Sequence, residues 1–370
     1  MRAARKFVAI AASVVVLAAL NQIIEHGFGP FRINPYYARI LNLIGINITL
    51  AVSLNLINGL AGQFSLGHAG FMAVGGYTAT YLTVYHGASI AALAGSTLAD
   101  GVGASVAMLA SLIAGACAAA VAGLVVGIPS LRLKGDYLAI VTLGFGEIIR
   151  VVILNVPAVG GATGFTDAVP ITNFFWIFAM AILTIVVVRN IATSTFGRVL
   201  TAIRADEIAA EAIGIQTTRH KVMAFVISAA LAGMAGGLSG QLFANPLNPQ
   251  NLNFVKSIEV VVMIVLGGIG STTGAVFGAT SLTILPEALR GVDRQLPGMR
   301  MVIYALLLVL LMIFRPQGVF GRREFGWDWV RRPNRTKIPV ALADATDAVR
   351  HTDRRPVDRR STLGEGDRDE

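Results

Sequence analysis

Residues 40–70 read ILNLIGINITLAVSLNLINGLAGQFSLGHAG, and no Asp, Glu, Lys or Arg occurs between Ile40 and Ala99. An uncharged stretch of this length has to be buried in lipid or among other membrane helices. The whole chain agrees, since 55% of its 370 residues are hydrophobic, 14% are charged and the mean hydropathy is +0.68. A soluble globular chain carries about 25% charged residues. The composition therefore excludes a soluble enzyme, a disordered protein and a disulfide-rich secreted domain as the main interpretation.

Apolar runs divide the chain into about ten candidate transmembrane helices. The run Ile258–Gly268 is too short to cross a ~30 Å hydrocarbon core, which takes ~20 residues, so it either extends into its flanks or forms a half-helix. We predict an all-α polytopic membrane protein with short or broken helices near the midplane. The candidate spans are Phe7–Ile24, Ile40–Asn58, His68–Tyr85, Val102–Gly127, Tyr137–Val156, Phe174–Val188, Val222–Phe243, Ile258–Gly268, Ala275–Leu289 and Met301–Phe314.

Three regions follow from this division of the chain. Residues 1–39 are predicted to hold an N-terminal transmembrane helix and an outer loop, although the same run also fits a cleaved signal peptide. Residues 40–314 form the membrane core. Residues 315–370 carry 13 Lys or Arg and 10 Asp or Glu. We expect them to form a basic segment near the membrane, with Trp327 and Trp329 at the lipid headgroups, and then a disordered cytoplasmic tail.

The distribution of basic residues predicts that both termini are cytoplasmic. Ten spans place both termini on one side, and the N-terminal Arg and Lys residues, Arg132, Lys134, the loop from Arg189 to Lys221 and the tail fall on that side. The net charge of +9 therefore reflects membrane orientation, and no nucleic-acid partner is expected. The outer side receives Arg32, Arg39, Lys256, Arg290, Arg294 and Arg300.

Polar side chains between the first core spans are the first candidates for a function. Asn47, Asn55 and Asn58 fall within an arc of about 80° on one helix, which is typical either of a permeation path or of helix–helix hydrogen bonding. Gln63, Ser65 and His68 belong to the glycine-rich stretch that follows. That stretch is either a broken segment near the path or a plain loop. No other metal-ligating side chain has a suitable spacing from His68, so we expect neither a metal nor a cofactor.

A second candidate is the pair Glu147 and Arg150, whose i,i+3 spacing lets them meet on one helix face. Charged residues inside the membrane are costly, so the pair is either functional or a neutralised structural pair. Apart from this pair, we expect a neutral polar path lining with no fixed pair of charges for a zwitterion. The stretch Leu266–Ser271 resembles Leu56–Gly62 as a glycine-rich interruption, a weak sign of an internal repeat.

The polar loop Thr193–Lys221 is the third candidate. Helix formers predict one helix over Ala202–Gly214 that ends at Gly214. On that helix Arg204, Glu207 and Glu211 share an arc of about 60°, while alanines lie opposite. One face fits ion pairs and the other fits close contact with a neighbouring surface; an ordinary solvated amphipathic segment is the alternative.

The chain holds no Gly-x-x-x-x-Gly-Lys-[Ser/Thr] phosphate loop and no catalytic constellation, so we do not expect an enzyme. ATP hydrolysis, where needed, belongs to other subunits. A gradient-driven secondary transporter or channel is the competing interpretation, and Glu147, Glu259 and Glu287 are the acids it would have to use.

The segment GDYLAIVTLGFGEIIR at Gly135–Arg150 resembles a hallmark of the permease subunits of branched-chain amino acid ABC importers. Four further stretches resemble the same family in register, so the likeness covers about residues 40 to 320. They are Leu54–Gly70, Ala202–Gly214, Val265–Ser271 and Arg315–Gly318. The long charged tail departs from the family.

This resemblance implies a heteromeric importer in a bacterial inner membrane. A second permease subunit would complete the path, two ATP-binding cassette subunits would drive it, and a periplasmic binding protein would deliver branched-chain amino acids. Related permeases carry urea or short amides, which stays an alternative. Importer permeases also carry a Glu-Ala-Ala, three residues, Gly pattern that docks on the ATPase. Ala209, Ala210 and Gly214 keep that spacing here, but Ile208 occupies the Glu position and Glu207 stands one residue earlier.

Overall fold

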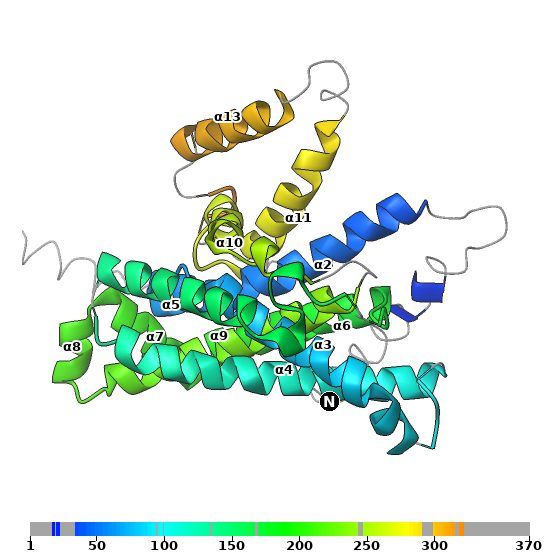
Figure 1. Cartoon of the computed structure of the whole chain (residues 1–370). Coiled ribbons are helices and arrows are strands. Elements are labelled where there is room, and N and C mark those ends of the chain that lie inside the picture. Colours follow the sequence, from blue (N-terminus) through cyan, green and yellow to red (C-terminus); the bar gives the residue numbers. More distant parts are fainter. Residues whose placement is uncertain are drawn as a thin grey trace, which may run out of the picture. The chain divides into compact units, whose positions relative to one another are not determined.

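The computed structural model describes residues 17–22 without 19, residues 34–314 without 94, 99, 134, 167–168, 243–246 and 291–298, and residues 318–321. In these residues the regular elements are helices, and β pairing is confined to one bridge between Phe165 and Leu247. The predicted all-α class is therefore confirmed (Figure 1). The predicted first span Phe7–Ile24 lies largely, and the tail almost wholly, outside the described residues.

The helices follow one another along the chain, with the longest connection in the described residues between Leu154 and Phe174. The α-helices are α2 (Pro35–Asn55), α3 (His68–Leu93), α4 (Gly101–Ser130), α5 (Asp136–Leu154), α6 (Phe174–Thr193), α7 (Thr195–Ala205), α8 (Glu207–Ala212), α9 (Thr217–Gly240), α10 (Phe254–Gly267), α11 (Thr272–Ala288) and α13 (Met299–Phe314). A π-helix, η1 (Leu56–Ala61), continues α2, and three 3₁₀ turns occupy Pro157–Val159, Gly161–Thr163 and Pro249–Asn251.

Six helical segments in the described residues are long and apolar enough to cross a membrane, which is fewer than the predicted ten or so. Helix α3 has 26 residues, but its Gly, Thr and Tyr residues lower its hydropathy. Helices α11 and α13 have 17 and 16 residues, which is short for a span. The six segments are Pro35–Ala61, Gly101–Ser130, Tyr137–Leu154, Phe174–Thr193, Thr217–Gly240 and Pro249–Gly267. The last of these segments shows that the short run Ile258–Gly268 extends into its N-terminal flank.

Helices α3, α4 and α9 pack side by side through glycines (Figure 1). A Cβ atom added to Gly236 on α9 would lie 1.9 Å from the carbonyl oxygen of Met72 on α3. A Cβ atom on Gly75 would lie 2.2 Å from the Cα of Gly233. Small residues let membrane helices bring their backbones together, because dispersion contacts and not exclusion from water drive their association. The glycines of α3 and α9 are therefore packing positions.

Helix α2 is the most buried of the candidate spans, with every residue from Ile44 to Asn55 buried. It packs against α6, α9, α10 and α11. The last two form a tight hairpin, in which a Cβ atom on Gly278 would lie 1.9 Å from the carbonyl oxygen of Met263. The polar residues of α2 consequently meet protein and not lipid.

We predict that Gly236→Ala destabilises the protein. The new methyl group has no room beside Met72, and overpacking of this kind costs about 1–3 kcal/mol. Thermal unfolding of the purified protein in detergent measures the loss. Gly144→Ala on α5 is the matched control, because nothing lies within 4 Å of the added methyl group. It should be neutral or gain up to about 1 kcal/mol from the better helix former. Equal stability of the two variants would contradict the packing role.

Candidate functional site

The three asparagines of the predicted polar stripe are all buried, and two of them face the α10–α11 hairpin. The Nδ2 of Asn47 donates to the Oγ1 of Thr283 on α11 at 2.9 Å. The Oδ1 of Asn55 accepts from the backbone N–H of Gly270, in the turn between α10 and α11, at 2.8 Å. In the isolated chain these amides hydrogen-bond helices together, as membrane interfaces commonly do.

Asn58 faces the other way, toward the non-helical segment Gly62–Gly67. Its Oδ1 accepts from the backbone N–H of Ser65 at 3.2 Å. The N–H of Leu66 donates to the Oγ1 of Thr142 on α5 at 3.1 Å. Gln63 turns back onto its own turn, with its Nε2 3.4 Å from the carbonyl oxygen of Ala61. The stretch is thus a break between helices in which protein covers Ser65 and Gly67, while Gly62 and Phe64 are exposed in the isolated chain.

His68 begins α3 and is only 1% exposed. Its Nε2 lies 2.8 Å from the Oγ of Ser53 on α2. Since that hydroxyl donates to the carbonyl oxygen of Leu50, the hydrogen bond assigns the imidazole proton to Nε2. His68 therefore ties the start of α3 to the last turn of α2.

Several polar atoms in this region are buried with no hydrogen-bond partner in the described part of the chain. They are Asn55 Nδ2, Asn58 Nδ2, Ser65 Oγ and His68 Nδ1. Buried polar groups are nearly always bonded in folded proteins. Four of the nine buried atoms without a partner in the described residues therefore lie between residues 55 and 68.

The Glu147–Arg150 pair predicted from the sequence forms on α5, with 2.6 Å between Oε2 and Nε. The other carboxylate oxygen accepts from the backbone N–H of Phe254 at 3.0 Å, at the first turn of α10. An acid at a helix N-terminus is stabilised by the helix dipole. The contact favours the structural interpretation of the pair, because it fixes α10 to α5.

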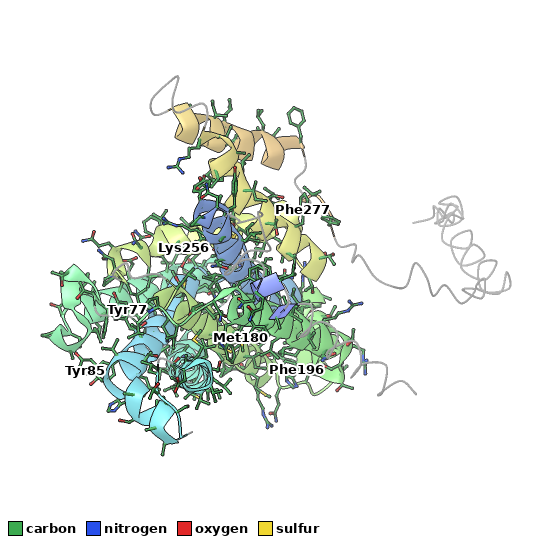
Figure 2. The ribbon with its side chains drawn as sticks, turned by 90° about the vertical axis from the view of Figure 1, so that its right-hand side faces the viewer. Tyr77, Tyr85, Met180, Phe196, Lys256 and Phe277 are labelled. Carbon is green, nitrogen blue, oxygen red and sulfur yellow. The ribbon has the colours of Figure 1, made fainter. Side chains whose placement is uncertain are left out.

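A second charged pair was missed in the sequence. Lys256, assigned above to an outer loop, lies on α10 (Figure 2), where its Nζ is 3.0 Å from the Oε2 of Glu259. The same Nζ donates to the Oδ1 of Asn47 at 3.2 Å. The side chains of Lys256 and Glu259 are 21% and 38% exposed. A charged pair therefore meets Asn47, whereas the expectation of a path lining without a fixed charge pair stays a prediction. The i,i+3 spacing would have revealed the pair had the short run been extended toward Phe254.

The single helix predicted over Ala202–Gly214 is also wrong, because it is broken at Asp206. There the backbone is extended, with φ −157° and ψ 111°, and the carboxylate accepts from the N–H groups of Ile208 and Ala209. An aspartate that caps a new helix in this way ends the preceding one. Gly214 terminates α8 with φ +87°, as predicted.

The break separates the predicted charged face into two. Glu207 on α8 forms an ion pair of 2.7 Å with the buried Lys221 of α9, and Glu211 accepts from the Oγ1 of Thr217 at 2.7 Å. Ala210 is buried, whereas Ala209 is exposed. The outward surface of α8 is instead apolar, since Ile208 and the adjoining Ile213 are 74% and 76% exposed. Arg204 lies on α7 and donates to the backbone carbonyl of Gly59 in η1.

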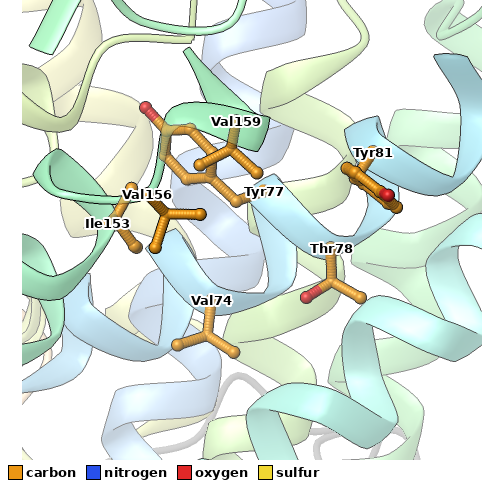
Figure 3. A pocket seen from close by; sticks show the side chains of 7 residues that line it. All are labelled: Val74, Tyr77, Thr78, Tyr81, Ile153, Val156 and Val159. Atoms are coloured by element: carbon orange, nitrogen blue, oxygen red, sulfur yellow. The ribbon is translucent and has the colours of Figure 1, made fainter. Parts of the chain in front are cut away.

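An apolar hollow of about 290 Å³ lies elsewhere, between α3 and the end of α5 (Figure 3). Tyr77, Tyr81, Ile153 and Val156 are among its lining residues. None of the predicted polar site residues lines it, so the hollow and the asparagine stripe are separate features.

Comparisons with known proteins agree on one family. Its model, described as branched-chain amino acid transport system / permease component, matches residues 36–312. The high-affinity branched-chain amino acid transport system permease protein LivM of Escherichia coli is 34% identical over 327 residues, covering 78% of this chain and 71% of that protein. LivM of Salmonella typhimurium is 33% identical with the same coverage. LivH of Salmonella typhimurium, also a permease protein of that system, is 35% identical over 170 residues, covering 45% of this chain and 53% of that protein. No solved structure matches significantly.

We predict that Asn55→Leu lowers stability by about 1–3 kcal/mol, because the N–H of Gly270 loses its acceptor in a protein interior. Unfolding of the purified chain in detergent measures this loss. Asn190→Leu, an exposed asparagine on α6, is the control and should change little. An unchanged midpoint for Asn55→Leu would refute the bracing role.

Proposed function

This chain belongs to the family of branched-chain amino acid transport system permease components, and we propose that it works as a transmembrane permease subunit of an ATP-driven importer of branched-chain amino acids. The observation that carries the proposal is the family match over residues 36–312, which includes all six apolar helical segments. A gradient-driven transporter is less favoured, because each of the acids it would have to use, Glu147, Glu259 and Glu287, is paired with a basic side chain three residues away.

The assembly and topology are proposed on the same basis. A second permease chain completes the path, two ATP-binding cassette subunits hydrolyse ATP, and a periplasmic binding protein delivers the substrate. The chain lies in a bacterial inner membrane with about ten spans and cytoplasmic termini, as the positive-inside rule favours. Residues 40–314 form the permease core, in which the 26-residue α3 is long enough to span and α11 and α13 contribute short segments. Urea or short amides remain the alternative cargo.

We propose that the substrate path runs along the inner face of α2. It involves Asn47, Asn55, Asn58, Gln63, Ser65, His68 and Glu147, to which Lys256 and Glu259 are now added. The unmet polar atoms between residues 55 and 68 support this placement, since a path for a polar solute needs donors and acceptors. Lys256 and Glu259 offer one partner for the carboxylate and one for the ammonium of a zwitterionic amino acid.

Lys256→Met should reduce uptake by the reconstituted importer at least about tenfold, because a hydrogen bond to a charged group is worth about 1.5–3 kcal/mol. The double variant Lys256→Met, Glu259→Gln removes the penalty of an unpaired acid. It should stay impaired if the pair binds substrate and recover if the pair only braces α10. Arg290→Met is the control, since Arg290 faces Glu287 at the same i,i+3 spacing but is 57% exposed. Wild-type uptake in the assembled single variant would refute the substrate contact.

We propose that α8, the cytoplasmic coupling helix, docks on the ATPase through its apolar surface. The predicted acidic contact is less suitable, because Glu207 and Glu211 are engaged with Lys221 and Thr217 within the chain. Reversing the charge of Glu207 would break that internal ion pair before it tested any partner. Ile208 and Ile213 are the exposed anchors that a groove on the ATPase would bury, with Ala209 close to them.

The double variant Ile208→Asp, Ile213→Asp should lower the amount of ATPase that co-purifies with the permeases by at least about tenfold, the effect of losing a well-buried anchor. Leu133→Asp changes an apolar residue of comparable chemistry on another predicted cytoplasmic loop, and it should co-purify normally. Undiminished co-purification of the α8 variant would contradict docking through these isoleucines.

A further inference from the structure

We propose that Arg204 is a positioning residue through which the cytoplasmic helices α7 and α8 set the conformation of the two helix breaks in the membrane core. The breaks are η1 with the following segment up to Gly67, and the turn Gly268–Ser271 between α10 and α11. The inference rests on the proposed function and goes beyond it. It assigns a link inside this chain and not a contact with the ATPase.

The first contact joins Arg204 to η1. One guanidinium nitrogen, Nη1, donates to the backbone carbonyl of Gly59. The stem of the side chain lies against Gly62, where a Cβ atom would come within 2.6 Å of the Cγ of Arg204. Gly62 has φ +68° and ends the π-helix. The charged group and the aliphatic stem thus hold both the middle and the end of this irregular turn.

The second contact brings the other break to the same place. A Cβ atom on Gly270 would lie 3.0 Å from the Nη1 of Arg204, so the guanidinium passes close to that backbone. The N–H of Gly270 also donates to the side chain of Asn55 at 2.8 Å. Asn55 is the residue immediately before η1. A Cβ atom on Gly59 would lie 2.8 Å from the Cα of Gly270. The two breaks therefore touch each other, with the guanidinium group beside both.

Helix α7 is suited to transmit a displacement to this junction. Its inward residues Gly197, Leu200 and Ile203 are buried, and α7 packs against η1 as well as α6 and α9. Because the chain is broken at Asp206, a contact from outside can displace α8 while α7 keeps its own packing. A hydrogen bond with a charged donor is about twice as strong as a neutral one, so a movement of α7 has to carry Gly59 with it or lose that bond.

The π-helix supplies the element with two arrangements. Short π-helical turns are rare in proteins, but those that occur are often found at functional sites. Return to α-helical hydrogen bonding would rotate Asn58 away from Ser65 and shift the register of the following segment. Coupling between distant sites requires such a two-state element whose equilibrium both sites bias. We assign that role to η1, with Arg204 as the bias from the cytoplasmic side.

The experiment uses the complete reconstituted importer and compares Arg204→Met, Arg204→Lys and Arg198→Met. Methionine keeps a stem against Gly62 but removes the donors. Arg198 is an exposed arginine on the same helix, bonded to Thr193, and serves as the control. The readouts are co-purified ATPase, ATP hydrolysed per amino acid transported, and amide hydrogen exchange of residues 56–62 with and without a non-hydrolysable ATP analogue.

We expect Arg204→Met to retain the ATPase but to hydrolyse at least about tenfold more ATP per molecule transported. We expect Arg204→Lys to be intermediate and Arg198→Met to match wild type. Nucleotide should change exchange at residues 56–62 in wild type and not in Arg204→Met. A wild-type hydrolysis ratio in Arg204→Met would overturn the proposal. Failure of both Arg204 variants to assemble, with Arg198→Met assembling, would also overturn it, because the role would then be structural. Absence of branched-chain amino acid uptake by the wild-type importer would instead count against the proposed function.

Discussion

A backbone inside a membrane has no water to bond to. Where a helix is interrupted, its free N–H and C=O groups therefore have to be hydrogen-bonded by other protein groups. This constraint organises the centre of the fold. In the segment after η1, the N–H of Ser65 donates to the side chain of Asn58, and the N–H of Leu66 donates to the side chain of Thr142. At the start of α3, the N–H of Ala69 donates to the hydroxyl of Ser257 at 2.9 Å. In the hairpin turn, the N–H of Gly270 donates to the side chain of Asn55. Side chains from α2, α5 and α10 thus complete the backbone of elements far from them in sequence.

The same constraint explains why polar residues and glycines occur together here. A side chain can reach a carbonyl or an N–H only where the two backbones approach closely, and close approach requires residues without a Cβ atom. Gly59 and Gly270 meet this requirement beside Asn55, and Gly67 does so beside Thr142. The contact of Asn55 with Gly270 and that of Thr142 with Leu66 therefore each lie beside such a glycine. Four buried polar atoms without a hydrogen-bond partner in the described residues also lie in this region, on Asn55, Asn58, Ser65 and His68.

The sequence was sufficient wherever local chemistry decides the structure. It predicted the helical membrane class, the glycine-rich interruption at Leu56–Gly62, the end of α8 at Gly214 and the meeting of Glu147 with Arg150. It failed where tertiary contacts decide. Lys256 was assigned to the outer side because the predicted span began only at Ile258, whereas α10 begins at Phe254. The inward direction of Arg204 had no local signal at all. Asp206 did carry one, since an aspartate before helix formers is a typical N-cap, but the continuous run of helix formers concealed it. The functional roles of the site residues remain predictions.

The exposure of Glu259 gives the core an orientation that hydropathy alone cannot supply. Its side chain is 38% exposed in the isolated chain, on a helix that buries Val260, Met263 and Ile264 on another face. An acid turned toward hydrocarbon is costly even when a lysine pairs with it, because lipid solvates neither charge. This surface of α10 therefore has to meet water or another polar protein surface in the assembled transporter.

The side chains of Val255 and Ile258 are exposed on the same helix, at 57% and 40%, and a polar path alone would leave them in water. A surface that presents both an ion pair and aliphatic side chains is best matched by a boundary where a second permease chain covers the aliphatic part and the path adjoins the ion pair. Under the proposed function, we infer that α10 lies between the substrate path and the second permease chain.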